Sequence, residues 1–325
     1  MEFFGKTNID FLGKRRLFFL LSLTTSIVGL LVIAIWGLDY GIDFEGGTEV
    51  AVELRPAPDV GDIRSAIGTA GFRGAEIKSY GRPNQFLIRV KESLATAHGE
   101  DPTTTILSVL REHFSGHTVT LLKSDKVGPK IGAEMRFNAL IAIIFATLAI
   151  LTYIAFRFEF IYGLGATIAL VHDVVIAISA IAIVHHLGIL RIEVNQSVLA
   201  ALLTVVGFSV NDTVIIFDRI RENRERHKGM NLIKLMNLSI NETLSRTINT
   251  VLTTVLVLLA ILFLGGEVLQ GFAFTMLVGI LTGTYSSIFI ASAFVVWFLQ
   301  TVRKIDLESE YRRLQEAERK ATAQA

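Results

Sequence analysis

Six stretches of the chain are apolar over about 20 residues, the length that an α-helix needs to cross the hydrocarbon core of a bilayer. They cover residues 17–36, 137–156, 160–184, 198–217, 244–264 and 272–299. The second and third stretches are separate helices, because Arg157 and Glu159 interrupt a run that is too long for one span. The pattern predicts an α-helical polytopic membrane protein with six transmembrane helices.

The segment between the first and second spans has a polar composition and the hydrophobic periods of a small folded domain. The expected elements are a strand at 50–54, a helix at 63–67, strands at 77–80 and 86–90, a helix that Pro102 opens, and a strand at 118–122. The order β-α-β-β-α-β is that of the ferredoxin-like split motif. We therefore expect an inserted α+β ferredoxin-like domain.

The basic residues predict the orientation of the spans. Lys and Arg gather in the short segments on one side, whereas Arg191 is the one basic residue in the short loops of the other side. We expect both termini to be cytoplasmic, the first span to be an uncleaved anchor, and the large domain to be periplasmic. The expected parts are an N-terminal segment 1–16, a first helix 17–36, a periplasmic domain 37–130, helices two to six within 131–302 with a cytoplasmic loop 219–243, and a tail 303–325.

Composition removes several function classes. Hydrophobic residues make up 51% of the chain, charged residues 19%, and the formal net charge of +1 provides no field that would attract nucleic acid. The chain has no Cys, so thiolate metal sites and cysteine nucleophiles are excluded. It also lacks a phosphate-binding G-x-x-x-x-G-K-[ST] motif and any zinc-binding spacing of His residues. We expect neither enzymatic activity, nor a cofactor, nor a metal site.

Ionisable and polar groups inside apolar spans are the candidate functional residues, because each is costly in a membrane unless it is paired or lies in a wet interior. His172 and Asp173 occupy the middle of the third span. Asn211 and Thr213 flank Asp212 in the fourth. His172, Asp173, Asn211 and Thr213 could form a proton relay or could make interhelical polar contacts.

Asp212 is the strongest candidate for proton coupling. A carboxylate buried in the bundle can change its protonation near neutral pH, whereas Arg246, at the start of the fifth span, stays charged. An Asp with a movable Arg forms a proton switch. The alternative is that Asp212 reaches the cytoplasmic interface together with Asp218 and Arg219, but a short Asp side chain suits this role less well than Lys or Arg.

Two further patterns concern packing. Gly279 and Gly283 form G-x-x-x-G in the sixth span, which favours close contact between helices. The cytoplasmic segment 219–243 has the pattern of an amphipathic helix or helix pair, with apolar side chains available to lie against the membrane or a partner. These side chains are Leu232, Ile233, Leu235, Met236 and Leu238.

Several motifs together resemble the bacterial SecF family. They are G-I-D-F-E-G-G-T at 41–48, V-G-P-K-I-G at 127–132, H-D at 172–173, L-L-T-V-V-G-F-S-V-N-D-T-V-I-I-F-D-R-I-R-E-N at 202–223 and S-I-N-E-T-L-S-R-T-I-N-T at 239–250. With six spans and one large outer domain, the resemblance covers nearly the whole chain.

The resemblance implies a place in protein export. SecF proteins are similar to one half of an RND-type transporter and pair with SecD. The pair associates with the SecYEG channel, and often with YajC and YidC, and uses the proton-motive force to pull preproteins across the bacterial inner membrane. Asp212 and Arg246 match the proton-coupling residues of the family.

Gly41, Asp43, Gly46 and Gly47 match the first glycine motif of the same family. Gly46 and Gly47 stand at the junction with the outer domain, where glycine permits backbone angles that other residues avoid. We expect a hinge at this position. Membrane lipid and preproteins are the other expected partners.

Two other functions compete with this interpretation. A half-size RND-type exporter of small molecules or lipids would need an apolar pocket in the outer domain, which is small and polar. A non-transporting scaffold of the translocon would act through contact area alone, and it would tolerate Asp212→Asn and Arg246→Ala.

Overall fold

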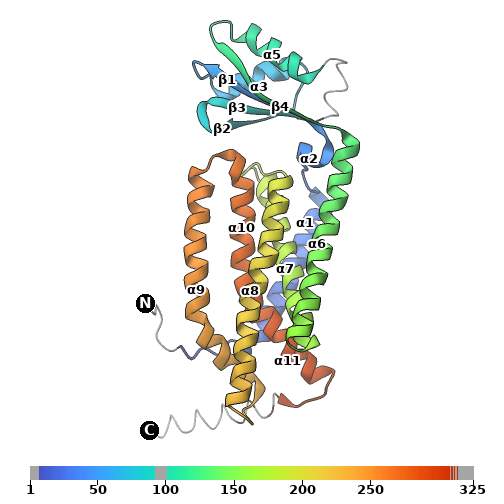
Figure 1. The fold of residues 1–325 in the computed structure, drawn as a ribbon, viewed down its shortest axis with the longest axis vertical. Coiled ribbons are helices and arrows are strands. Elements are labelled where there is room, and N and C mark those ends of the chain that lie inside the picture. The colour runs from blue at the N-terminus through green and yellow to red at the C-terminus, as the bar shows by residue number, and fades with distance from the viewer. Residues whose placement is uncertain (1–6, 92–100, 308, 310, 312, 314–325) are drawn as a thin grey trace.

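The computed structural model describes residues 7–91, 101–307, 309, 311 and 313. A bundle of long helices stands beneath a small domain with a β-sheet (Figure 1). Six helical segments are long and apolar enough to span a membrane, which confirms the six predicted spans. They are α1 (Arg15–Trp36), preceded by a 3-10 turn (Leu12–Lys14), then α6 (Pro129–Arg157), α7 (Phe160–His186), α8 (Gln196–Arg226), α9 (Leu232–Leu264), and α10 (Glu267–Ser286) with its continuation.

The sixth span differs from the single helix that the sequence predicts. After α10 the backbone forms a π-helical segment (Ser287–Ala291) and then α11 (Ser292–Thr301). This span lies at the centre of the bundle, because 67% of its most apolar window is buried, against 6% for α6 and 11% for the first span. The central helix therefore carries the irregular turn, whereas the outer helices are regular.

Helices α8 and α9 extend well beyond their apolar runs. The connection at 219–243, predicted as a cytoplasmic amphipathic helix or helix pair, is helical for most of its length, and only residues 227–231 separate the two helices. Asn231 caps α9 by accepting a hydrogen bond from the backbone N–H of Ile233 at 3.0 Å. Arg246 consequently lies about four turns inside α9 and not near the end of a helix.

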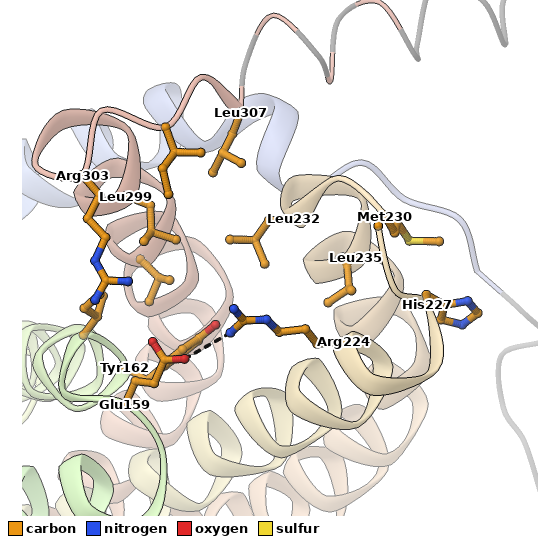
Figure 2. Close-up of a pocket in the computed structure, with 14 residues that line it drawn as sticks. Glu159, Tyr162, Arg224, His227, Met230, Leu232, Leu235, Leu299, Arg303 and Leu307 are labelled. Atoms are coloured by element: carbon orange, nitrogen blue, oxygen red, sulfur yellow. Dashed lines mark hydrogen bonds and ion pairs between the residues drawn. The ribbon is translucent and has the colours of Figure 1, made fainter.

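The apolar side chains of this connection pack inward, so the expectation that they face the membrane or a partner is wrong. Ile233, Leu235 and Met236 are buried in a core that also contains Ile220 and Leu299. Figure 2 shows the cavity of about 230 Å³ beside this core. At its edge Arg224 of α8 donates to Glu159, the residue before α7, at 3.1 Å. These contacts fix the end of the bundle that lies opposite the sheet.

The small domain has the predicted ferredoxin-like topology. Its elements are β1 (Gly47–Arg55), α3 (Val60–Thr69), β2 (Glu76–Tyr80), β3 (Arg82–Lys91), α5 (Pro102–His113) and β4 (Thr118–Val127). The strands are antiparallel in the order β2-β3-β1-β4. Val50, Val52 and Leu54 alternate into a core with Ile63 of α3 and Ile106 of α5. The helices thus cover one face of the sheet, and the other face turns toward the bundle (Figure 1).

Candidate functional site

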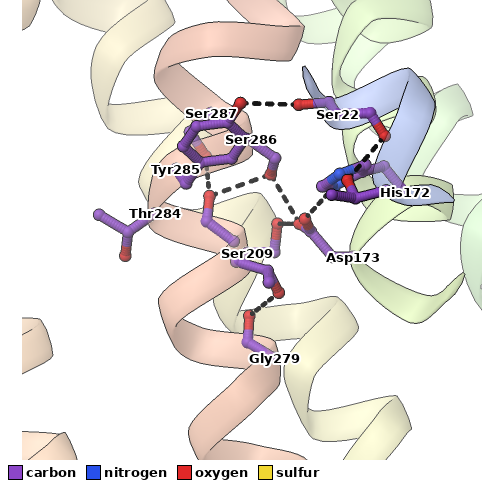
Figure 3. A network of polar contacts seen from close by, with 12 residues as sticks. Ser22, His172, Asp173, Ser209, Gly279, Thr284, Tyr285, Ser286 and Ser287 are labelled. Carbon is purple, nitrogen blue, oxygen red and sulfur yellow. Dashed lines mark hydrogen bonds and ion pairs between the residues drawn. The ribbon is translucent and has the colours of Figure 1, made fainter. Parts of the chain in front are cut away.

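Asp173 is the centre of a polar cluster inside the bundle. Its side chain comes from α7 and is fully buried, with 0% of the residue exposed. Ser209 of α8 and Ser286 of α10 each donate a hydrogen bond to Asp173 Oδ2 at 2.7 Å. His172 Nδ1 lies 3.0 Å from Asp173 Oδ1 (Figure 3). One carboxylate therefore joins three helices of the bundle.

The first span is tied to this cluster through Tyr285. The hydroxyl of Tyr285 donates to the carbonyl of Phe18 at 2.9 Å and lies 2.8 Å from the hydroxyl of Ser22. The ring of Tyr285 is also adjacent to that of His172, with 6.3 Å between ring centroids. The cluster thus extends from α7 to α1 and places the first span against the centre of the bundle.

Asp212 has fewer hydrogen-bond partners than Asp173. It lies on α8, is 1% exposed, and accepts one hydrogen bond, from Thr284 Oγ1 at 3.3 Å. The same hydroxyl also lies 3.0 Å from the carbonyl of Ile280, so its single proton is shared between two acceptors. A buried carboxylate with one long, shared hydrogen bond is a costly group.

Arg246 does not touch Asp212. Its charge acts on Asp212 through space, but no carboxylate in the described part of the chain lies within ion-pair distance of Arg246. The Arg246 side chain is exposed on α9, and Asn211 is exposed on α8. Asp212 and Arg246, the two residues of the predicted switch, therefore interact through space without a direct contact in this single chain.

Thr213 belongs to a different contact from Asp212. Its hydroxyl lies 2.7 Å from the hydroxyl of Ser287, the first residue of the π-helical segment. The side-chain hydroxyl of Ser292 in turn donates to the carbonyl of Ser287 at 3.1 Å, across the π-helical segment. Two consecutive serines, Ser286 at the end of α10 and Ser287 at the start of the π-helical segment, thus contact α7 and α8 respectively.

The sequence did not predict the hydrogen-bond donors of this site. Ser209, Thr284, Ser286 and Ser287 are missing from the predicted set, although they contact three of its members. The signal available was the run T-G-T-Y-S-S at 282–287, which is polar within an apolar span. Short hydroxyl side chains in a helix most often bond to their own backbone, so the run alone does not indicate a site.

The glycine motif lies outside the bundle, where the sheet domain joins it. Gly46 has φ +84°, and a Cβ at this position would lie 2.8 Å from Cα of Pro129. Gly47 approaches the carbonyl of Val90, which a Cβ would meet at 2.4 Å. The motif also includes α2 (Ile42–Glu45), which packs on α6. Glycine is required here for close approach as well as for backbone angle.

Gly41 and Asp43 connect the same joint to α8. Asp43 Oδ2 accepts from the backbone N–H of Gln196, the first residue of α8, at 2.9 Å. The backbone N–H of Gly41 donates to the carbonyl of Val194 at 3.0 Å. The carboxylate of Asp43 thus occupies the positive end of the helix that carries Asp212.

The geometry defines a class of protein. Within residues 7–91 and 101–307, no group of His, Cys, Asp and Glu side chains could hold a metal ion. The bundle provides a buried carboxylate with few partners, a separate arginine, and a long helix that links this carboxylate to an outer domain. These features define a polytopic membrane protein with an ionisable group in its membrane-spanning bundle, a kind of residue that often marks a functional site.

Comparison with known proteins identifies the family. Residues 107–301 match the family described as protein export membrane protein SecD/SecF, C-terminal, and residues 32–58 match the SecD/SecF GG motif. A protein translocase subunit SecF from Calditerrivibrio nitroreducens is 39% identical over 92% of this chain and 96% of its own length. One from Gemmatimonas aurantiaca is 38% identical over 100% of this chain and 94% of its own length. The chain belongs to the SecD/SecF family.

Solved structures show the same architecture. The crystal structure of SecDF from Thermus thermophilus, described as a translocon-associated membrane protein, matches with a TM-score of 0.74 and 37% identity. The match covers 90% of this chain and 39% of that protein. A crystal structure of SecDF in a super-membrane-facing form matches with a TM-score of 0.69 and 35% identity over 98% of this chain and 41% of that one. The chain spans about two fifths of the SecDF proteins.

Proposed function

We propose that this chain is a SecF-like subunit of the Sec protein-export machinery. In this role it pairs with SecD and uses the proton-motive force to complete the translocation of preproteins through SecYEG. The family match and the full-length relatives support the export subunit over a small-molecule exporter. The matched SecDF proteins are more than twice as long, and in this proposal SecD corresponds to their remaining part.

The buried, poorly hydrogen-bonded carboxylate of Asp212 is the observation that carries the proposal. A proton on this carboxyl group removes its charge and with it the attraction of Arg246. Because α8 carries Asp212 and α9 carries Arg246, the loss of attraction changes the preferred spacing of the two helices. One elementary charge that crosses a potential of 100 mV releases about 2.3 kcal/mol, which is enough to bias two conformations.

The movement reaches the outer domain through α8. Asp212 lies about 24 Å along the helix from Gln196, at 1.5 Å per residue. Gln196 is held by Asp43, and α2 leads through Gly46 and Gly47 into β1. A shift of α8 therefore pulls on the joint and tilts the sheet domain about these glycines. In this scheme His172 and Asp173 act as interhelical contacts and not as a relay, since the Asp173 carboxylate is already bonded by three side chains.

The proposal includes a location and an orientation. The protein lies in the bacterial inner membrane with both termini in the cytoplasm and the sheet domain in the periplasm. Arg157, Arg224 and Arg303 lie at the end of the bundle opposite the sheet, as positive charges on the cytoplasmic side would. YajC and YidC are further partners of the assembly. Single cysteines placed in this cysteine-free chain and labelled from either side of the membrane test the orientation.

The decisive experiment follows a preprotein that is trapped halfway through the channel in inverted membrane vesicles. ATP is removed, a proton gradient is imposed, and completion is measured for the wild type and for Asp212→Asn. We expect gradient-dependent completion in the wild type and its loss in the variant. Asp218→Asn is the matched control, because Asp218 lies on the same helix, is exposed, and pairs with Arg157 at 3.5 Å.

Assembly must be measured in the same membranes. Co-purification of SecD and SecYEG with each variant shows whether the complex is intact. Equal completion by the wild type and Asp212→Asn, with the complex intact, would contradict proton coupling through Asp212 and would favour a scaffold that acts through contact area.

A further inference from the structure

Glu193 places a carboxyl group in the contact between the bundle and the sheet domain. It lies in the connection between α7 and α8, and 7% of the residue is exposed. Its neighbour Val194 forms a parallel bridge with Tyr40. One oxygen of Glu193, Oε2, is 3.2 Å from the position that a Cβ on Gly41 would take. The backbone on both sides therefore fixes where this carboxyl group lies.

The sheet presents a second carboxyl group to Glu193. Glu76 of β2 faces it within hydrogen-bonding reach. Glu76 pairs with Lys78 and lies 3.5 Å from Arg89 of β3. Arg89 donates in addition to Glu49 of β1 at 2.7 Å. The two carboxyl groups thus meet on the face of the sheet that turns toward the bundle.

Other charged groups surround this pair on every side. They are Lys78, Arg89, Glu49 and Lys123 on the sheet, with Asp39, His185 and Glu267 on the bundle side. Asp39 is already paired with Lys91 at 2.7 Å and with His185 at 3.2 Å. Glu267 of α10 accepts from the backbone N–H of Ser79 at 3.3 Å, which makes a second contact between the bundle and β2.

The charges of the buried cluster do not balance when every carboxyl group is ionised. Lys78 and Arg89 supply two buried positive charges, and Glu49 and Glu76 already neutralise them, while Lys123 is half exposed and pairs with Asp125. Glu193 is a third carboxyl group. Burial, and after it the adjacent charge of Glu76, raises the pKa of Glu193 to about 8. Burial alone would raise the pKa of Glu76 as well, but the contacts with Lys78 and Arg89 more than offset it and lower that pKa.

We propose that Glu193 and Glu76 form a proton-binding site on the outer side of the molecule, shared between the bundle and the sheet domain. The ligand is a single proton. On Glu193 it allows the neutral carboxyl group to donate to the Glu76 carboxylate, and it holds the sheet domain against the bundle. The role of this site in the export cycle rests on the proposed function. If the proton-motive force drives export, protons enter from the outer side, where they would bind Glu193 and favour the docked state.

The direction of the pH dependence follows from linkage. The pKa of Glu193 is about 8 when the domain is docked and returns toward the ordinary value of 4.5 when the contact opens. The docked state binds the additional proton between these two values. Docking is therefore at full strength below about pH 4.5 and weakens by up to about tenfold per pH unit as the pH rises toward 8.

The test measures docking directly in the full chain. The absence of native cysteines allows a spin-label pair at Arg64→Cys on α3 and Leu264→Cys at the end of α9, both at exposed positions. Distances are measured in lipid nanodiscs between pH 5 and pH 9. The wild type should show one docked distance at pH 5 and a growing second population toward pH 9. Glu193→Gln should stay docked throughout, since an amide donates to Glu76 without carrying a charge.

Two further variants keep the result interpretable. Glu76→Gln removes the charge next to Glu193 and should flatten the pH dependence, and it replaces Glu193→Gln if that variant does not fold. Glu112→Gln on α5 changes an exposed carboxylate away from the contact and should behave like the wild type. A wild-type distance that does not change with pH overturns the proposal, as does an unchanged pH response in both Glu193→Gln and Glu76→Gln.

The measurement does not depend on export. If Asp212→Asn exports normally while docking still follows the protonation of Glu193, the proton-coupling proposal fails and the outer proton site stands. If docking does not depend on pH while Asp212→Asn loses gradient-dependent export, the outer proton site fails and the proton-coupling proposal stands.

Discussion

Asp173 and Asp212 are both aspartates buried in the middle of the same bundle, but their surroundings differ. Asp173 is bonded by Ser209, Ser286 and His172, from α8, α10 and its own helix. Asp212 has one long hydrogen bond, from Thr284. A carboxylate with its partners in place is part of the structure, whereas one that lacks them can gain or lose a proton at little structural cost. The difference separates a structural group from a switching group, which the sequence alone could not do.

The largest effect is expected from Arg246→Ala. Removing the charge that acts on Asp212 should reduce gradient-dependent export by at least about tenfold, the equivalent of 1.4 kcal/mol, in the vesicle assay. Because Arg246 is exposed, thermal unfolding of the detergent-solubilised chain should not change. Arg246→Lys keeps the charge and should retain part of the activity. Normal export by Arg246→Ala would contradict the role of Asp212 as a switching group and so its distinction from the structural Asp173.

The next largest effect is a difference in stability between alanine variants of the two aspartates. Asp173→Ala leaves the buried hydroxyl of Ser209 without its acceptor, at about 1–3 kcal/mol for an unsatisfied buried group, whereas Ser286 can still donate to the carbonyl of Gly283. Asp212→Ala removes one long hydrogen bond and should cost less. Unfolding curves for both variants in the same detergent measure the difference. Asp173→Asn keeps an acceptor, and the folded fraction should export with the wild-type dependence on the gradient; loss of that dependence would make Asp173 part of the proton path.

The contact between α8 and α10 that brings these groups together can be tested through Gly279. A Cβ at Gly279 would lie 2.2 Å from a methyl carbon of Val205, so Gly279→Ala should destabilise the bundle by about 1–3 kcal/mol. Gly207→Ala on α8 is the control, because nothing lies within 4 Å of its Cβ position. This control should be neutral or slightly stabilising. Equal unfolding of the two variants would show that close packing of α10 on α8 is unimportant.

The smallest effect is expected from Thr284→Val. The hydroxyl already has the carbonyl of Ile280 as an acceptor, so its loss should cost at most about 1 kcal/mol and change export by less than tenfold. Thr284→Ser, which keeps the hydroxyl, should resemble the wild type in both measurements. A loss of export as large as that of Arg246→Ala would mean that Thr284 holds Asp212 in place.

The sequence predicted those features that repeat along the chain. Runs of about 20 apolar residues predicted the six spans, and the alternation of Val50, Val52 and Leu54 predicted a strand with one buried face. The spacing of Gly279 and Gly283 also predicted close packing, and Gly283 does lie against Ser209. Period and composition are local properties, so one sequence is sufficient to read them.

The polar contacts depend on how separate helices meet, and the sequence did not predict them. Ser286, the last residue of α10, reaches Asp173 on a different helix, and the π-helical segment that follows it has no composition signal of its own. The burial of Glu193 could not be predicted either, because a glutamate in a short loop is usually exposed and here a sheet that is distant in sequence covers it. The end of α8 and the start of α9 were misjudged for another reason: polar residues end an apolar run without ending a helix.

The lengths of α8 and α9 determine where the movement of these helices can be measured. At 1.5 Å per residue their 31 and 33 residues extend for about 46 and 50 Å, whereas a hydrocarbon core is about 30 Å thick. The tip of the hairpin, at 227–231, therefore protrudes into water. A fluorescent probe at this tip would report relative sliding of the two helices without entering the lipid. Its signal would therefore follow the movement of α8 and α9 that a change at Asp212 produces.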